Sequence, residues 1–363
     1  MRILFKNAII ITMNKCSDVL YNHDILVEDA RIKQISENIS TENVDRVIDC
    51  KGQILMPGFI NVHFHSVDPY IDYKTLIKCG ITTVLDINSE PERSASAMDQ
   101  VGIRGLVGIG AFTGRETLTD ENLDYVRNKV LDANSDVKIV VWAKNIFNVN
   151  ENDFETLIMY AKKHDFLIST HCSETLEEVG ECANKNNDMS PIALLEDYGF
   201  LNCKSLLVHC VHCDKDDVEI LKYYDTAIVS CPSSNLVSAS GIAPLYSYLK
   251  NNITVCLGTD VPVNNAPNMF KEMFLAKNLQ AGILNEKNLV SDMQVIRMAT
   301  CDGAKALGLT DCGSIEEGKF ADIILIGLDS EKPQCEIVSN ANISNINLTM
   351  INGKIVYENC NLV

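Results

Sequence analysis

A chain of 363 residues is long enough for one large domain or two, and an apolar fraction of 46% is typical of a soluble globular protein. A formal net charge of -18 argues against a nucleic-acid ligand, because the phosphates would be repelled, and no apolar run approaches the roughly 18 to 20 residues of a membrane span. The 14 cysteines, in a large chain without a recognisable secretory signal, indicate reduced thiols and a cytoplasmic location.

The two ends of the chain have β character. The first 55 residues predict short strands joined by turns, with candidates at 3–5, 8–13, 25–27 and 47–49. This is too little for an independent domain, so the strands need a partner sheet. The end of the chain supplies further candidates at 322–326, 337–338, 348–351 and 354–357. Asn352-Gly353 predicts a type I′ hairpin between the last two. We therefore expect residues 1–55 and 309–363 to form one composite β-sandwich domain.

The middle of the chain, residues 56–308, alternates apolar strand-like runs with helical segments such as 151–164 and 214–224. Eight strand candidates lie at 59–65, 82–86, 104–108, 138–142, 167–171, 205–209, 227–230 and 254–260. Eight βα units over roughly 250 residues have the size and rhythm of a TIM (β/α)8 barrel. The expected fold class is therefore α/β, with a barrel in the middle and a small β-sandwich made by the two ends.

Several of the predicted barrel strands end in a side chain that can bind a metal. His63 and His65 end the first strand, and they point to the same face because side chains alternate along a strand. His171, His209 and Asp260 end the fifth, sixth and eighth strands. A single buried histidine is usually a core residue, but five such side chains at strand ends are hard to explain by packing. Because chemistry sits at the carboxyl ends of barrel strands, they predict a metal site.

Eight short motifs follow one another in order along nearly the whole chain. They are PGFINVHFH at 57–65, HCSET at 171–175, VHCVH at 208–212, CPSSNL at 231–236, GIAP at 241–244, LGTD at 257–260, GAKALGL at 303–309 and GSIEEGKFAD at 313–322. With these motifs the chain resembles the amidohydrolase superfamily, in its branch of S-adenosylhomocysteine deaminase-like and triazine hydrolase-like enzymes. The resemblance implies the barrel fold and a hydrolytic, metal-dependent activity.

The resemblance also implies a role for particular residues. One divalent metal, expected to be Zn2+ with Fe2+ or Mn2+ as alternatives, would be held by His63, His65, His171 and Asp260. Asp260 would also take a proton from the attacking water, Glu174 would carry a proton to the leaving group, and His209 would stabilise the tetrahedral adduct. His212 has a weaker claim, and it is otherwise a loop residue or a support for the site. The implied reaction is deamination of an aminated N-heterocycle, such as a nucleobase, a pterin or a nucleoside, with release of ammonia.

The sequence departs from the family pattern at three places. The stretch after His65 lacks the longer helical insertion of nucleoside-type members, which argues against adenosine-like substrates. Lys144 stands where the family usually has a histidine. We hypothesise that it binds the substrate, together with His209, and favours an anionic or carbonyl-rich molecule; the alternative is an ordinary salt-bridging lysine. In the segment 261–265, Val261 and Pro262 also differ from the family, whereas Asn264 and Asn265 resemble it, and the difference is expected to reshape the pocket wall.

Two other functions stay open at this point. Lys144 could be carbamylated and bridge two metals, as in binuclear cyclic amidases and dipeptidases. A binding protein on an old enzyme scaffold would instead show a broken set of metal ligands. A structural zinc at Cys210 and Cys213 is disfavoured, because no second CxxC pair lies at zinc-ribbon spacing. Because Glu174 and every expected ligand are present, we predict a metal-dependent cytoplasmic aminohydrolase that acts on a small molecule. The resemblance leaves a homodimer open.

Overall fold

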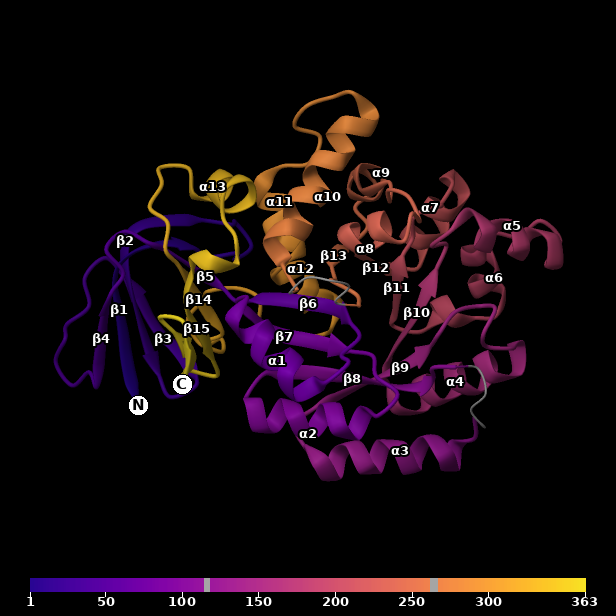
Figure 1. Cartoon of the computed structure of the whole chain (residues 1–363), viewed down its shortest axis with the longest axis horizontal. Helices are drawn as coiled ribbons and strands as arrows, with labels where there is room; N and C mark the ends of the chain where they lie inside the picture. The colour runs from indigo at the N-terminus through magenta and orange to yellow at the C-terminus, as the bar shows by residue number, and fades with distance from the viewer. Residues whose placement is uncertain (114–117, 262–266) are drawn as a thin grey trace.

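The computed structural model describes residues 1–113, 118–261 and 267–363, and it contains a barrel and a separate β-sheet side by side (Figure 1). Both ends of the chain lie in the separate sheet. None of the helices in the described residues combines the length and the apolar character that crossing a membrane requires.

The separate sheet is built from both ends of the chain. Among the described residues it has nine strands, in the order β17-β16-β15-β14-β5-β1-β2-β3, with β4 paired to β1. Their bounds are β1 Arg2–Ile11, β2 Val19–Glu28, β3 Arg31–Ser36, β4 Arg46–Asp49, β5 Ile54–Pro57, β14 Ile323–Ile326, β15 Ile346–Ile351, β16 Lys354–Glu358 and β17 Asn361–Leu362. Ile3 and Ile25 pack in one buried cluster with Ile323 and Met350. The prediction that the two ends of the chain build one β structure together is confirmed, and its strands belong to one continuous sheet. Its predicted boundaries, at residues 55/56 and 308/309, stay a prediction.

The details of this sheet differ from the prediction at three places. The two strands predicted at 3–5 and 8–13 are one strand, β1, which changes register around Asn7, where φ is 57°. The strands β3, β5 and β17 were not predicted. The strand predicted at 337–338 is wrong, because these residues lie in helix α13 (Pro333–Ser339). Two apolar residues carry no periodicity, so a helix and a strand look alike there. The Asn352-Gly353 hairpin is confirmed, with φ of 50° and 70° as a type I′ turn requires.

The barrel contains the eight predicted parallel strands, so the predicted fold class is confirmed. Within the described residues they run in the order β6 to β13, with bounds β6 Phe59–Phe64, β7 Ile81–Asp86, β8 Arg104–Ala111, β9 Lys138–Ala143, β10 Leu167–Cys172, β11 Ser205–His209, β12 Ala227–Ser230 and β13 Val255–Leu257. A parallel bridge between Phe64 and Asp260 joins the last strand to the first. Side chains of Ile60, Val140 and Val208 fill the interior.

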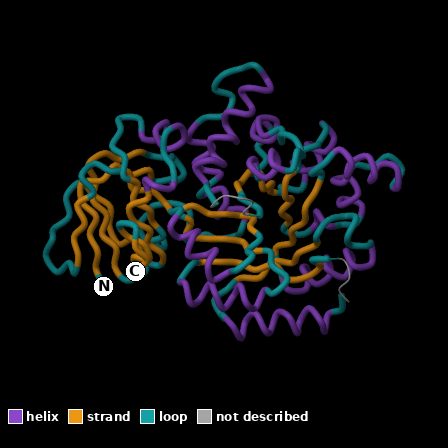
Figure 2. The backbone as a smooth tube through the Cα atoms, in the orientation of Figure 1, coloured by secondary structure: helices purple, strands orange, loops and turns teal. Residues whose placement is uncertain are grey.

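Helices surround the barrel strands on the outside (Figure 2). They are α1 Pro69–Lys78, α2 Pro91–Val101, α3 Asp120–Ala133, α4 Glu151–His164, α5 Leu176–Lys185, α6 Pro191–Asp197, α7 Lys215–Tyr223, α8 Pro232–Val237, α9 Leu245–Lys250, α10 Met269–Leu284, α11 Asp292–Met298 and α12 Cys301–Ala306. Helix α4 matches its prediction because its sequence carries both ends: Asn150 caps the first turn, and Asp165 adopts the left-handed conformation after the last. Phe154, Leu157 and Ala161 form its buried stripe.

Candidate active site

Four predicted ligands converge at the carboxyl end of the barrel. One donor atom from each of His63, His65, His171 and Asp260 lies within 4.8 Å of the others, the one such group found among the described residues. Nε2 of His63 is 3.1 Å from Nε2 of His171 and 3.4 Å from Oδ1 of Asp260. Nε2 of His65 is 3.5 Å from the same carboxylate oxygen. A tetrahedral zinc with donors at 2.0 to 2.2 Å requires donor separations of about 3.3 to 3.6 Å. The donor set therefore fits a single metal ion.

The backbone brings the first and last strands close enough to form this group. A Cβ atom on Gly258 would lie 2.8 Å from Cβ of His63 and 2.9 Å from its carbonyl oxygen, so only glycine fits there. The backbone N–H of Asp260 donates to the carbonyl oxygen of His63 over 3.0 Å. Asn61 adds two side-chain hydrogen bonds to Thr259. These contacts fix Asp260 beside the histidines of β6.

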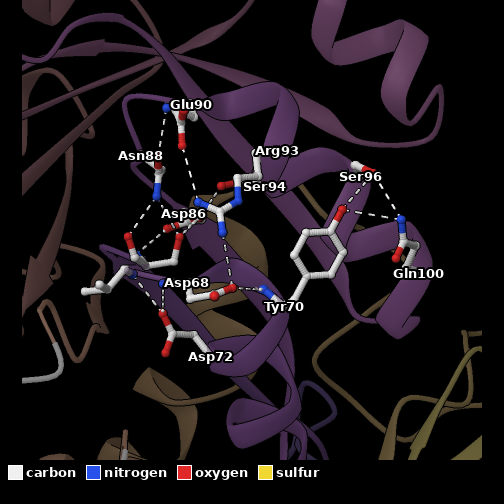
Figure 3. A network of polar contacts seen from close by, with 12 residues as sticks. Asp68, Tyr70, Asp72, Asp86, Asn88, Glu90, Arg93, Ser94, Ser96 and Gln100 are labelled. Atoms are coloured by element: carbon white, nitrogen blue, oxygen red, sulfur yellow. Dashed lines mark hydrogen bonds and ion pairs between the residues drawn. The ribbon is translucent and has the colours of Figure 1, made fainter.

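A hydrogen-bond network behind His65 sets the orientation of its ring. Nδ1 of His65 donates a hydrogen bond to the carbonyl oxygen of Ile87 over 2.8 Å. This leaves Nε2 of His65 free to bind a cation. The following Ser66 donates both its N–H and its hydroxyl to the buried carboxylate of Asp86. Asp86 also accepts from the hydroxyls of Tyr73 and Ser94. Figure 3 shows Asp86 and Ser94 within this network. No role was predicted for Asp86; its place at the end of β7 was the available signal.

The protonation states of the ligands suit a cation. Burial, followed by electrostatic repulsion from the neighbouring His65 ring, lowers the pKa of His63 to about 4. Burial also holds the pKa of His171 well below its ordinary value. Burial opposes ionisation of Asp260, but the hydrogen bond and the charge of His63 outweigh it, and the pKa of Asp260 falls well below its usual range. Neutral imidazoles and an ionised carboxylate are the forms that bind metals.

Glu174 lies beside this group because of a tight turn after β10. Ser173 adopts a left-handed conformation with φ of 51°. The carboxylate of Glu178 accepts the backbone N–H groups of Ser173 and Glu174, over 3.1 and 2.6 Å. The turn directs the Glu174 side chain toward His209, with Oε2 of the glutamate 3.8 Å from Nε2 of the histidine. Two of the predicted catalytic side chains therefore face one another.

His209 ends β11 and borders the ligand group. Its ring centroid is 5.0 Å from that of His171 and 6.0 Å from that of His63. Its Nδ1 is 2.9 Å from Oδ1 of Asn235, which leaves Nε2 directed at Glu174. His212 lies apart from the ligand group, and its Nε2 donates to the backbone carbonyl of Ser240 over 2.7 Å.

Lys144 follows β9 on the interior face of the barrel. Val140 and Trp142 both pack in the interior, and Lys144 continues their alternation. Its carbonyl oxygen accepts from the N–H of His171, which places Lys144 next to a predicted ligand. The side chain is half-buried and forms no ion pair or hydrogen bond with any residue that the structure describes. The alternative of a salt-bridging lysine thus finds no partner there. In the segment 261–265, for which a difference from the family was noted, residues 262–265 lie outside the described residues.

Comparisons with known proteins agree with this geometry. Residues 54–356 match the model of the Amidohydrolase family. A 5-methylthioadenosine/S-adenosylhomocysteine deaminase of Acetivibrio thermocellus is 31% identical over 408 aligned positions, which cover 99% of this chain and 94% of the relative. An adenosine deaminase of Xanthomonas campestris, solved with bound zinc, superimposes with a TM-score of 0.91 at 22% identity, over 99% of this chain and 94% of that one. A guanine deaminase of C. acetobutylicum, solved with guanine, reaches 0.84 at 21% identity, over 98% and 100% of the two chains.

Proposed function

The chain belongs to the amidohydrolase family, and from this premise we propose that it deaminates an aminated N-heterocycle by hydrolysis and releases ammonia. The observation that carries the proposal is the convergence of His63, His65, His171 and Asp260 beside Glu174 and His209. The enzyme depends on one divalent metal ion, for which we propose zinc. All 14 cysteines, each within the described residues, are free, which supports our proposal of a reducing, cytoplasmic environment.

The reaction adds the oxygen of water to the amine-bearing carbon and expels that amine as ammonia. When bound, a divalent ion supplies Lewis acidity, which makes hydroxide available near neutral pH. We propose that Asp260 accepts the proton of the attacking water. Glu174 then carries a proton to the departing nitrogen, as a general acid. Nε2 of His209 faces the same space and stabilises the charge of the tetrahedral adduct.

We propose a free aminated base, such as an aminopurine, as the substrate in preference to a nucleoside. The named relatives act on adenine or guanine compounds, which supports a purine ring. Helix α1 begins at Pro69, directly after the short segment 66–68 that follows His65, so this connection offers little chain to hold a ribose. Lys144, without a partner among the described residues, is suited to a ring carbonyl or an anionic group.

Ammonia release by the zinc-loaded enzyme tests this function directly. The screen should cover aminopurines, pterins, pyrimidines, nucleosides and triazines. We expect turnover of a free aminated base to exceed turnover of its nucleoside. Release from nucleosides alone would contradict the proposed substrate, and release from none of these compounds would overturn the proposed reaction.

Replacing Lys144 by methionine should weaken recognition of the substrate. Methionine keeps the length of the side chain but removes its charge, and a lost charge-assisted hydrogen bond corresponds to a fall in kcat/KM of about 10- to 100-fold. We expect most of this loss to appear as a rise in KM, because the amine of Lys144 binds the substrate ring and takes no part in the proton transfers. Lys162, exposed on α4, provides the matched control as Lys162→Met. Unchanged kinetics in Lys144→Met would refute the assigned role.

A further inference from the structure

We propose that one short segment, residues 233–240, positions the three proposed catalytic side chains of the site. The inference rests on the proposed function and concerns residues to which neither the sequence motifs nor the comparisons assign a role. The segment comprises helix α8 from its second residue onward, after β12, and the loop that follows the helix.

Each proposed catalytic side chain makes a hydrogen bond with this segment. The hydroxyl of Ser234 donates to Oδ2 of Asp260. Oδ1 of Asn235 accepts a hydrogen bond from Nδ1 of His209 over 2.9 Å. The hydroxyl of Ser240 donates to Oε1 of Glu174 over 3.1 Å.

Each of the three hydrogen bonds engages one polar atom of a proposed catalytic side chain and leaves the other polar atom free for the site. Ser234 occupies one oxygen of Asp260, and the other oxygen faces His63 and His65 at 3.4 and 3.5 Å. Asn235 and Ser240 in the same way occupy the atoms that point away from the site, so that Nε2 of His209 and Oε2 of Glu174 face each other. The segment therefore sets the orientation of all three side chains through these hydrogen bonds.

The segment is itself held at both ends. The carboxylate of Glu272, 1% exposed on α10, accepts the backbone N–H of Ser233 over 2.9 Å and also its hydroxyl. At the other end, the imidazole of His212 donates to the backbone carbonyl of Ser240. The N–H of Ser240 closes the loop onto the carbonyl of Asn235 over 2.9 Å. A segment that orients catalytic side chains must itself be held in place, and these hydrogen bonds hold it. Glu272 and His212 are accordingly positioning residues.

A measurement of zinc affinity should distinguish the variant that affects Asp260 from the variants that affect His209 and Glu174. Asp260 is a proposed ligand, so Ser234→Ala should weaken zinc binding by about 10- to 100-fold and lower kcat as well. His209 and Glu174 are not proposed ligands, so Asn235→Leu and Ser240→Ala should lower kcat by about 10- to 100-fold with zinc affinity unchanged. Ser234→Thr and Ser240→Thr keep the hydroxyl and should restore most of each loss.

The test compares these variants with wild type and with Ser238→Ala, whose side chain is exposed in the same segment. Zinc affinity is measured on metal-free protein by competition with a chromophoric chelator, kcat by ammonia release, and folding by the melting temperature. The split between Ser234→Ala and the other two supports the proposal. Equal zinc affinities in all variants, or losses that threonine does not restore, overturn it. If wild type releases no ammonia, the proposed function fails, while the zinc affinities still test how Asp260 is held.

Discussion

Ammonia release is expected to fall by about 10²- to 10⁴-fold when Glu174 is replaced by alanine, the usual worth of a general acid. Asp260→Ala should abolish turnover altogether, because it removes both a proton acceptor and one of the four converging donors. The two variants should differ in bound zinc. Glu174 is outside the donor group, so Glu174→Ala keeps its metal, whereas Asp260→Ala loses it. Zinc content, ammonia release and the melting temperature measure these three properties.

Neither substitution should unfold the barrel. Glu174 is half-buried, and the turn that carries it is held through its backbone N–H by Glu178, which alanine at position 174 leaves in place. The backbone bonds between Asp260 and His63 also stay in Asp260→Ala. Glu177→Ala, exposed on the first turn of α5, is the matched control for an acidic residue near the site. Turnover at the wild-type rate in Glu174→Ala or Asp260→Ala would rule out the assigned roles.

The candidate metal site could be predicted because each proposed ligand carries a local signal. His63 and His65 alternate along a predicted strand, and His171 and Asp260 end predicted strands. The period of the strands places such residues at one end of the barrel before any contact is known. The convergence of their donor atoms then follows from the closure of the barrel, which Gly258 permits by its close approach to His63.

The residues that orient the site could not be predicted in the same way. Ser240 and Glu174 are 66 positions apart, and Ser233 and Glu272 are 39 apart. Small polar residues are common in loops, and only the folded chain shows which of them meet a carboxylate. Asn235 and Ser234 lay in a motif of the family resemblance without a stated role. The strand wrongly expected at 337–338 has a related cause, since two apolar residues specify burial without specifying an element.

Removing the metal should abolish activity and lower the stability of the folded chain. A ligand that binds only the native state stabilises it by about 4 kcal/mol at 1,000 times its Kd, so the metal-free protein should melt at a lower temperature. The chain offers its own reporter of occupancy. Trp142, the one tryptophan, packs its ring 4.8 Å from that of His171 and 5.7 Å from that of His63. Its emission should therefore change as a chelator removes the ion and recover when zinc returns.

The stoichiometry of that recovery distinguishes the mononuclear site from its binuclear rival. Three imidazole nitrogens and one carboxylate oxygen form the converging group, so one zinc per chain should restore full activity. Mg2+ and Ca2+ should restore none, because these hard ions prefer oxygen donors. In the rival arrangement His209 would bind a second ion, yet its Nδ1 is occupied by Asn235 and its Nε2 faces Glu174. Two metals per chain, with the mass of carbon dioxide added to Lys144, would establish the binuclear enzyme instead.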